Sequence, residues 1–88
     1  MKSKHKYIIQ RIFQNPIQPG IIWKDIESAL IALGAEVSEG RGSRVRIAWN
    51  GIRAVFHRPH PHKETDKGAV CSMRRFLLEA GIKNYVDL

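Results

Sequence analysis

The fold of this chain is decided by the stretch Arg44–His57, which reads RVRIAWNGIRAVFH. Asn50-Gly51 at its centre is the strongest short-range signal for a two-residue β-hairpin turn. The flanking runs are rich in β-branched and aromatic residues and alternate in polarity, as strands with one buried face do. The stretch therefore predicts two antiparallel strands, over residues 44–49 and 52–57.

A two-residue turn also fixes which residues oppose one another across the hairpin. In this register one face receives only apolar side chains, which are Val45, Ile47, Trp49, Ile52, Ala54 and Phe56. The other face receives Arg44, Arg46, Arg53 and His57, with Ala48 and Val55 between them. A slip of one residue would bury arginines, so turn type and polarity indicate the same register.

Apolar residues at helical spacing predict three helices, over residues 4–14, 22–33 and 67–80. Gly34 and Gly81 are the expected C-terminal caps, and Thr65 or Asp66 is the expected cap of the last helix. Residues 35–38 are a candidate for a further short strand. We therefore expect an α+β fold with α-β-β-β-α order, in which a three-stranded antiparallel sheet packs on helices. Residues 1–20 are predicted to form an extra N-terminal helix and a Pro/Gly linker, and residues 21–88 the domain itself.

The same patterns assign side chains to the core or to solvent. The last helix is expected to point Val70, Met73, Phe76, Leu77 and Ala80 inward. Both tryptophans, Trp23 and Trp49, are expected in the core or at its edge. Cys71 is interpreted as a small buried or half-buried hydrophobic residue, and Arg74 and Arg75 as solvent-facing.

The charge of the chain is strongly asymmetric. Its 88 residues carry a net charge of +7, and the 23-residue stretch from Arg41 to Lys63 contains five Arg, one Lys and three His without one acidic residue. Residues 41–88 hold ten basic and four acidic groups, so six of the seven excess charges lie there. This asymmetry favours a polyanionic partner, with nucleic acid first and an acidic protein second. The remaining alternative is a solvated basic surface without a partner.

The sequence does not support a disulfide, a metal site or a nucleotide cofactor. One cysteine allows neither an internal disulfide nor a Cys-based zinc site. His57, His60 and His62 have no thiolate nearby, and the prolines between them resist convergence on a metal ion, so no metal site is predicted. The spacing of Gly40–Ser43 matches no nucleotide-binding loop, so no cofactor is expected. Without a secretory signal or membrane span, the expected location is the cytoplasm.

The basic stretch holds the groups that metal-independent RNA cleavage requires. Attack by the RNA's own 2′-OH needs a proton acceptor, a proton donor and cations over the phosphate. Either His57 or His60 could be the base. The residues expected to contact RNA are Ser43, Arg44, Arg46, Arg53, Arg58, Lys63 and Lys67. In the competing interpretation the histidines are ordinary loop residues, the arginines are the solvated side of an amphipathic sheet, and Lys67-Gly68 is an ordinary helix start.

Several landmarks in order resemble the HicA family, the toxins of HicBA type II toxin–antitoxin modules. They are Leu33-Gly34-Ala35, Gly42-Ser43 before the hairpin, Pro59-His60 after it, Lys67-Gly68, and the run RRFLLEAGI over residues 74–82. The resemblance covers residues 23–82. It implies a fold like that of double-stranded-RNA-binding domains, ribosome-independent cleavage of mRNA, and neutralisation by a HicB-like antitoxin.

The chain departs from the family at one position that matters for catalysis. A catalytic His commonly follows the Gly-Ser pair in the family, and this chain has Arg44 there. Because the hairpin register places His57 opposite Arg44, we hypothesise that His57 supplies the missing base, with His60 as the second candidate. Two alternatives remain, which are a domain that binds RNA or DNA without cleaving it and an interaction module that meets only an acidic protein.

Overall fold

The computed structural model describes residues 3–82 of the chain. Its elements follow the order α1 (Ser3–Ile12), α2 (Trp23–Leu33), β1 (Glu36–Glu39), β2 (Arg44–Trp49), β3 (Ile52–His57) and α3 (Lys67–Glu79). The three strands form one antiparallel sheet in the order β1-β2-β3. The predicted α+β fold with α-β-β-β-α order after a leading helix is therefore confirmed.

The hairpin has the predicted strands and register. Arg44 pairs with His57 at its open end, and Trp49 pairs with Ile52 next to the turn. Asn50 and Gly51 both adopt positive φ, at 50° and 81°, as the favoured two-residue hairpin turn requires. The first strand lies one residue later than predicted, because it begins at Glu36 rather than at Ala35.

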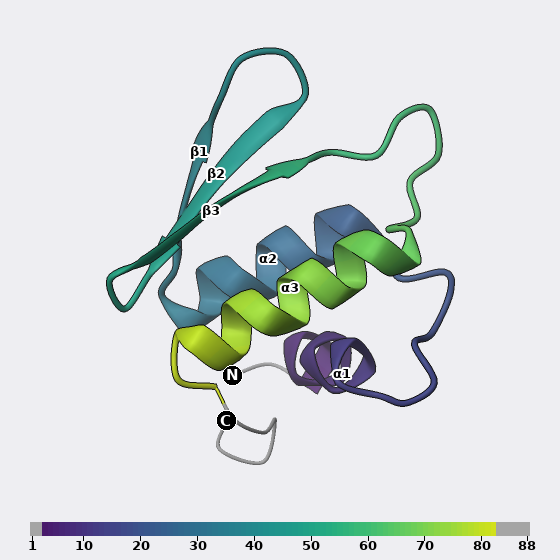
Figure 1. Cartoon of the computed structure of the whole chain (residues 1–88). Coiled ribbons are helices and arrows are strands. Elements are labelled where there is room, and N and C mark those ends of the chain that lie inside the picture. The colour runs from purple at the N-terminus through teal and green to yellow at the C-terminus, as the bar shows by residue number, and fades with distance from the viewer. Residues whose placement is uncertain (1–2, 83–88) are drawn as a thin grey trace.

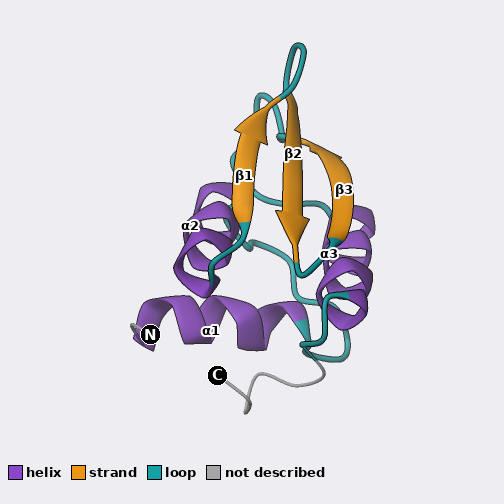
Figure 2. Ribbon diagram, turned by 90° about the vertical axis from the view of Figure 1, so that its left-hand side faces the viewer, coloured by secondary structure: helices purple, strands orange, loops and turns teal. Residues whose placement is uncertain are grey.

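The molecule has three layers (Figure 1). Helices α2 and α3 lie against one face of the sheet, where α2 contacts β1 and α3 contacts β3. Helix α1 lies across the other side of these two helices and contacts both (Figure 2). Its Ile8, Ile9 and Ile12 are 4%, 0% and 0% exposed and join the same hydrophobic cluster as the sheet. The extra N-terminal helix thus extends the core.

Local sequence signals account for the C-terminal end of α2 and for both ends of α3. Gly34 ends α2 in the left-handed conformation, at φ 104°. The Asp66 side chain accepts a 2.7 Å hydrogen bond from the Ala69 N–H and so caps the start of α3. After α3, Gly81 has φ 101° and the Ile82 N–H returns to the Leu77 carbonyl at 2.9 Å. The predicted caps at Gly34 and Asp66 are confirmed, and Gly81 adopts the predicted left-handed conformation directly after the C-cap residue Ala80.

Two predictions about α3 were wrong, although its five inward residues are buried as expected. Cys71 is exposed, because it lies outside the buried stripe of the helix. Arg74 is half-buried and donates to the carbonyl oxygens of Ile12 at 2.9 Å and Gln14 at 2.7 Å. These carbonyls belong to the end of α1 and the residues after it, where helical partners are missing. Arg74 therefore fastens α1 to α3.

Candidate nucleic-acid interface

The face of the sheet that points away from the helices has no covering element among residues 3–82 (Figure 2). We call it the outer face. Strand alternation places on it Glu36 and Ser38 from β1, Arg44, Arg46 and Ala48 from β2, and Arg53, Val55 and His57 from β3. The inner face holds Val45, Ile47 and Phe56, all buried in the core. The predicted separation of basic and apolar side chains is confirmed.

The register arranges the outer face in three rows that run across the strands. Arg44 and His57 form the row nearest the β1–β2 connection. In the middle row, Arg46 is paired with Ser38 on one side and with Val55 on the other. The three arginines and His57 are exposed to solvent. Three guanidinium groups and one imidazole are thus presented together from two adjacent strands.

The third row, nearest the hairpin turn, consists of Glu36, Ala48 and Arg53. Sequence reasoning missed the contribution of β1, because Glu36 and Ser38 lie outside the basic stretch. Only the pairing of β1 with β2 could have revealed them. The outer face is therefore cationic but carries one carboxylate.

The remaining predicted contacts lie beyond the outer face. Ser43 is exposed in the connection before β2, next to the Arg44–His57 row. His60 and Lys63 are exposed in the loop after β3, whose end is held to the start of α2 by a 3.0 Å hydrogen bond from the Trp23 N–H to the Lys63 carbonyl. Lys67 begins α3, in the helix layer. Ser43 is adjacent in sequence to the outer face, and its carbonyl accepts a 2.8 Å hydrogen bond from the Arg58 N–H. The structure does not bring His60, Lys63 or Lys67 onto this face.

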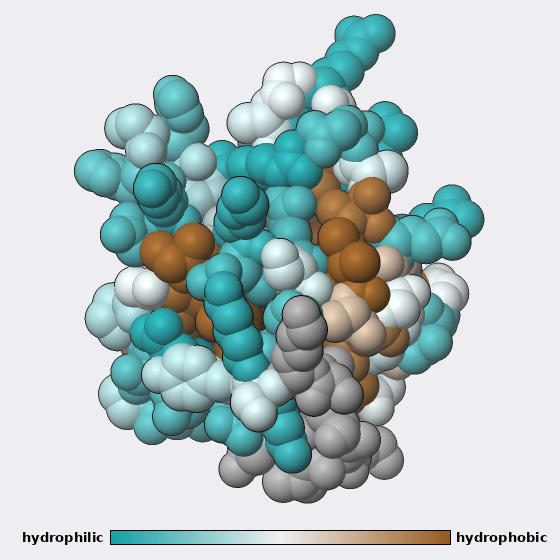
Figure 3. Space-filling model, turned by 180° about the vertical axis from the view of Figure 1, so that it is seen from behind, coloured by the Kyte–Doolittle hydropathy of each residue, from teal (hydrophilic) through white to brown (hydrophobic). Residues whose placement is uncertain are grey.

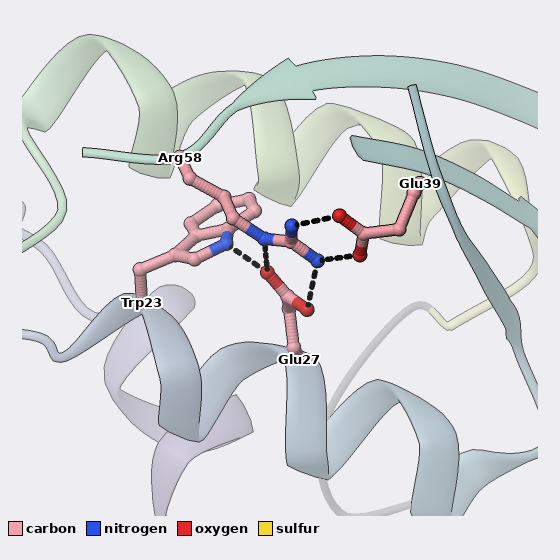
Figure 4. Close-up of polar contacts among 4 residues, drawn as sticks. All are labelled: Trp23, Glu27, Glu39 and Arg58. Carbon is pink, nitrogen blue, oxygen red and sulfur yellow. Dashed lines mark hydrogen bonds and ion pairs between the residues drawn. The ribbon is translucent and has the colours of Figure 1, made fainter. Parts of the chain in front are cut away.

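Arg58 has a different environment from the other predicted RNA contacts (Figure 4). Its guanidinium donates to both oxygens of Glu27 on α2, at 2.8 and 3.1 Å. It also donates to both oxygens of Glu39 on β1, at 2.6 and 2.7 Å. The Trp23 indole N–H adds a hydrogen bond to the same Glu27 carboxylate. Arg58 therefore joins β3, β1 and α2 through two bidentate ion pairs.

This network engages the Arg58 side chain within the fold, and we therefore do not propose Arg58 as an RNA contact. Four hydrogen bonds already tie its guanidinium to two carboxylates, and bidentate contact with a phosphate would require some of these bonds to break. The hydrogen bonds from Arg58 hold the pKa of the Glu39 carboxyl below its ordinary value. The hydrogen bonds to Glu39, and then those to Glu27, raise the pKa of Arg58 above its already high value. In the structure Arg58 therefore cross-links the end of β3 to α2 and β1.

Arg58→Met is expected to lower the free energy of unfolding at neutral pH by about 1–3 kcal/mol, because it leaves the largely buried Glu27 carboxylate without its partner. Since the folded-state pKa of Glu39 is lowered, its contribution is present above its ordinary pKa of 4.5 and is lost as the pH falls through the folded value. The difference between the variant and the parent should therefore shrink below pH 4.5. Urea unfolding as a function of pH measures this. Arg53→Met, on the exposed outer face, is the control and should change stability by less than about 0.5 kcal/mol.

The outer face is also hollowed. A hollow of about 510 Å³ is lined from all three strands, and a second of about 470 Å³ adjoins it towards the hairpin turn. Elsewhere, exposed large hydrophobic residues are scattered over α1, α2 and α3 as Tyr7, Ile31 and Leu78. From behind, hydrophobic surface appears in separate patches between hydrophilic side chains (Figure 3). On the outer face, positive charge and a concave shape therefore coincide.

Two other properties of the described residues bear on function. Within residues 3–82, no three His, Cys, Asp or Glu side chains lie close enough together to hold a metal ion. No helix in this part of the chain is long and apolar enough to cross a membrane.

Comparison with known proteins connects this arrangement to one family. No curated protein and no solved structure matches the chain significantly. The family of the HicA toxin of bacterial toxin–antitoxin systems matches residues 23–82, which run from the first residue of α2 to the residue after Gly81. The match covers most of the chain and contains the whole sheet and both helices that support it. The chain therefore belongs to the HicA toxin family, the toxins of bacterial toxin–antitoxin systems, and this membership implies a cognate antitoxin as its partner.

Proposed function

We propose that this toxin binds RNA through the outer face of its sheet and inhibits translation by cleaving mRNA, and that a HicB-like protein is its antitoxin. The observation that carries the proposal is the exposure of Arg44, Arg46, Arg53 and His57 together on a sheet face that no described element covers. Membership of the toxin family supplies the biological setting.

Binding follows from the charge of this face. Arginine guanidiniums contact phosphates bidentately, and contacts to the RNA backbone release counterions, so affinity depends steeply on salt. Arg44 and Arg46 alternate with Val45 along β2, and Arg53 lies on the neighbouring strand. Rigid strands therefore fix the spacing between the cations, which lowers the entropy cost of ordering them on a phosphate backbone.

In cleavage the 2′-oxygen forms a bond to phosphorus as the P–O5′ bond breaks. A group must therefore remove the proton of the 2′-OH, and the leaving 5′-oxygen must receive a proton from a second group or from water. His57 is the imidazole on the outer face, and its cross-strand neighbour is Arg44. A phosphate held by Arg44 would lie next to this imidazole, and the guanidinium would stabilise the negative charge that develops on the phosphate oxygens. His60 follows three residues later and is the second candidate for proton transfer.

A second function is favoured by one specific observation. Arg44 occupies the position where the resemblance to the family implies a catalytic histidine. If no imidazole replaces it, the protein binds RNA without cutting it, and inhibition arises from occupancy of the message. Both functions use the same face, so binding is tested first.

Arg46→Ala is expected to weaken RNA binding about 5- to 10-fold at moderate salt and to lower the slope of log affinity against log salt by about 0.7–1. Fluorescence anisotropy with 2′-O-methyl RNA, which cannot be cut through its own 2′-OH, measures both quantities. Arg75→Ala removes the same charge from an exposed position on α3 and should leave the affinity within about 2-fold of the parent. Equal losses in the two variants, or binding insensitive to salt, would reject the outer face as the RNA site.

A further inference from the structure

We propose that the outer face carries a site for an unpaired guanine base of RNA, in which the Glu36 carboxylate accepts hydrogen bonds from the Watson–Crick edge of the base. This inference rests on the proposed RNA-binding function and deepens it. It assigns Glu36 a role in choosing where on an RNA the protein binds.

The position of Glu36 is unusual for a surface that attracts phosphates. It is the acidic side chain of the outer face, in the row with Ala48 and Arg53. Within residues 3–82 it forms neither an ion pair nor a side-chain hydrogen bond, in contrast to Glu27 and Glu39. A carboxylate here repels the RNA backbone, and both of its oxygens keep their capacity to accept hydrogen bonds.

The hollows supply a place for a base beside this carboxylate. Glu36, Ala48 and Arg53 line both hollows and so form the boundary between them. The small Ala48 leaves the centre of this row open, and Val55, which is 57% exposed, adds apolar surface to the larger hollow. A volume of about 510 Å³ lies in the range of small-ligand sites. Aromatic side chains and guanidinium planes are the surfaces on which unpaired RNA bases stack, and Arg46 and Arg53 supply guanidinium planes at this hollow.

The chemistry of the carboxylate favours guanine among the four bases. An ionised carboxylate only accepts hydrogen bonds, and its two oxygens suit two parallel donors. Guanine presents adjacent N1–H and N2–H donors on its Watson–Crick edge. Adenine and cytosine present one amino group beside a ring acceptor, and uracil one N–H between two carbonyls. Arg46 and Arg53 flank the hollow and are placed to hold the adjacent phosphates, so that phosphate contacts position the RNA and Glu36 reads the base.

The test uses four unstructured 2′-O-methyl RNAs of equal length that differ only in a central G, A, C or U, with the full chain and fluorescence anisotropy. The parent should bind the G probe about 10-fold more tightly than the U probe, the effect of one good bidentate base contact. Glu36→Gln keeps the shape but loses the charge and one acceptor, and should reduce this ratio to below about 3-fold while binding the U probe at least as tightly. Glu79→Gln removes the same charge from an exposed position on α3 and should keep the full ratio.

The outcomes separate the two proposals. If all four probes bind equally with a steep salt dependence, RNA binding stands and guanine recognition is overturned. Guanine recognition by Glu36 is also overturned if Glu36→Gln binds the G probe with the same preference as the parent. Glu36 would then only place a charge on an edge strand. If no probe binds, both the RNA-binding proposal and this inference are overturned. A preference for G that Glu36→Gln abolishes and Glu79→Gln preserves supports the site.

Discussion

His57→Ala is expected to reduce the rate of RNA cleavage by about 10²- to 10⁴-fold, the usual contribution of a positioned general base. His57 is the imidazole that the strands place beside Arg44, where a bound phosphate would lie. The side chain is exposed and lies outside the core, so its removal should change the free energy of unfolding by less than about 0.5 kcal/mol. The loss of activity would then reflect chemistry rather than unfolding.

The measurement is the initial rate of cleavage of a structured mRNA by the purified variant, together with growth inhibition on expression. His60→Ala decides between the two candidate bases, and His62→Ala, an exposed histidine in the same loop, is the matched control. Full activity in folded His57→Ala would reject His57 as the base. If His60→Ala alone loses activity, the loop histidine takes the role. A parent protein that binds RNA with the predicted salt dependence but cuts none would establish the non-catalytic function.

Ile12→Ala is expected to lower the free energy of unfolding by about 2–5 kcal/mol, a large share of the stability of a domain of this size. Ile12 is fully buried at the end of α1, although it precedes the segment that matches the toxin family. Helix α1 contacts both α2 and α3, which support the sheet from below. A cavity at Ile12 therefore weakens the helices that support the sheet.

Urea unfolding followed by circular dichroism measures this effect. Tyr7→Ala is the matched control on the same helix, since the Tyr7 side chain is exposed and should cost less than about 1 kcal/mol. If Ile12→Ala were no more destabilising than Tyr7→Ala, α1 would be an appendage rather than part of the core. The family-matched residues 23–82 would then hold the fold without it.

Much of the fold was predictable because short-range rules set it. The Asn50-Gly51 turn and the alternation of Arg44–His57 gave the correct hairpin register, since both depend on residues only a few positions apart. The caps at Gly34 and Asp66 were predictable for the same reason. The candidate site followed in part from this register, because a correct pairing assigns each arginine of the hairpin to a face.

The unpredicted side-chain contacts depend on partners far apart in the chain. Arg58 looked like one more cation of the basic stretch, but its partners Glu27 and Glu39 lie 31 and 19 residues away. Arg74 looked solvent-facing, but it bonds to the Ile12 carbonyl 62 residues away. No local pattern reports such contacts, since they exist only after helices and sheet have packed together.

The sequence by itself therefore determined the basic hairpin, its register and the side of the sheet that faces solvent, because turn geometry and side-chain alternation act over a few residues. Only the tertiary structure decided which of these charges remain free. The fold brought Glu27 of α2 and Glu39 of β1 within reach of Arg58, which follows β3, and so committed Arg58 to two carboxylates. Pairing of β1 with β2 brought Glu36 onto the outer face. A stretch without acidic residues thus became a surface with one carboxylate in it, because neighbouring strands supply side chains from elsewhere in the chain.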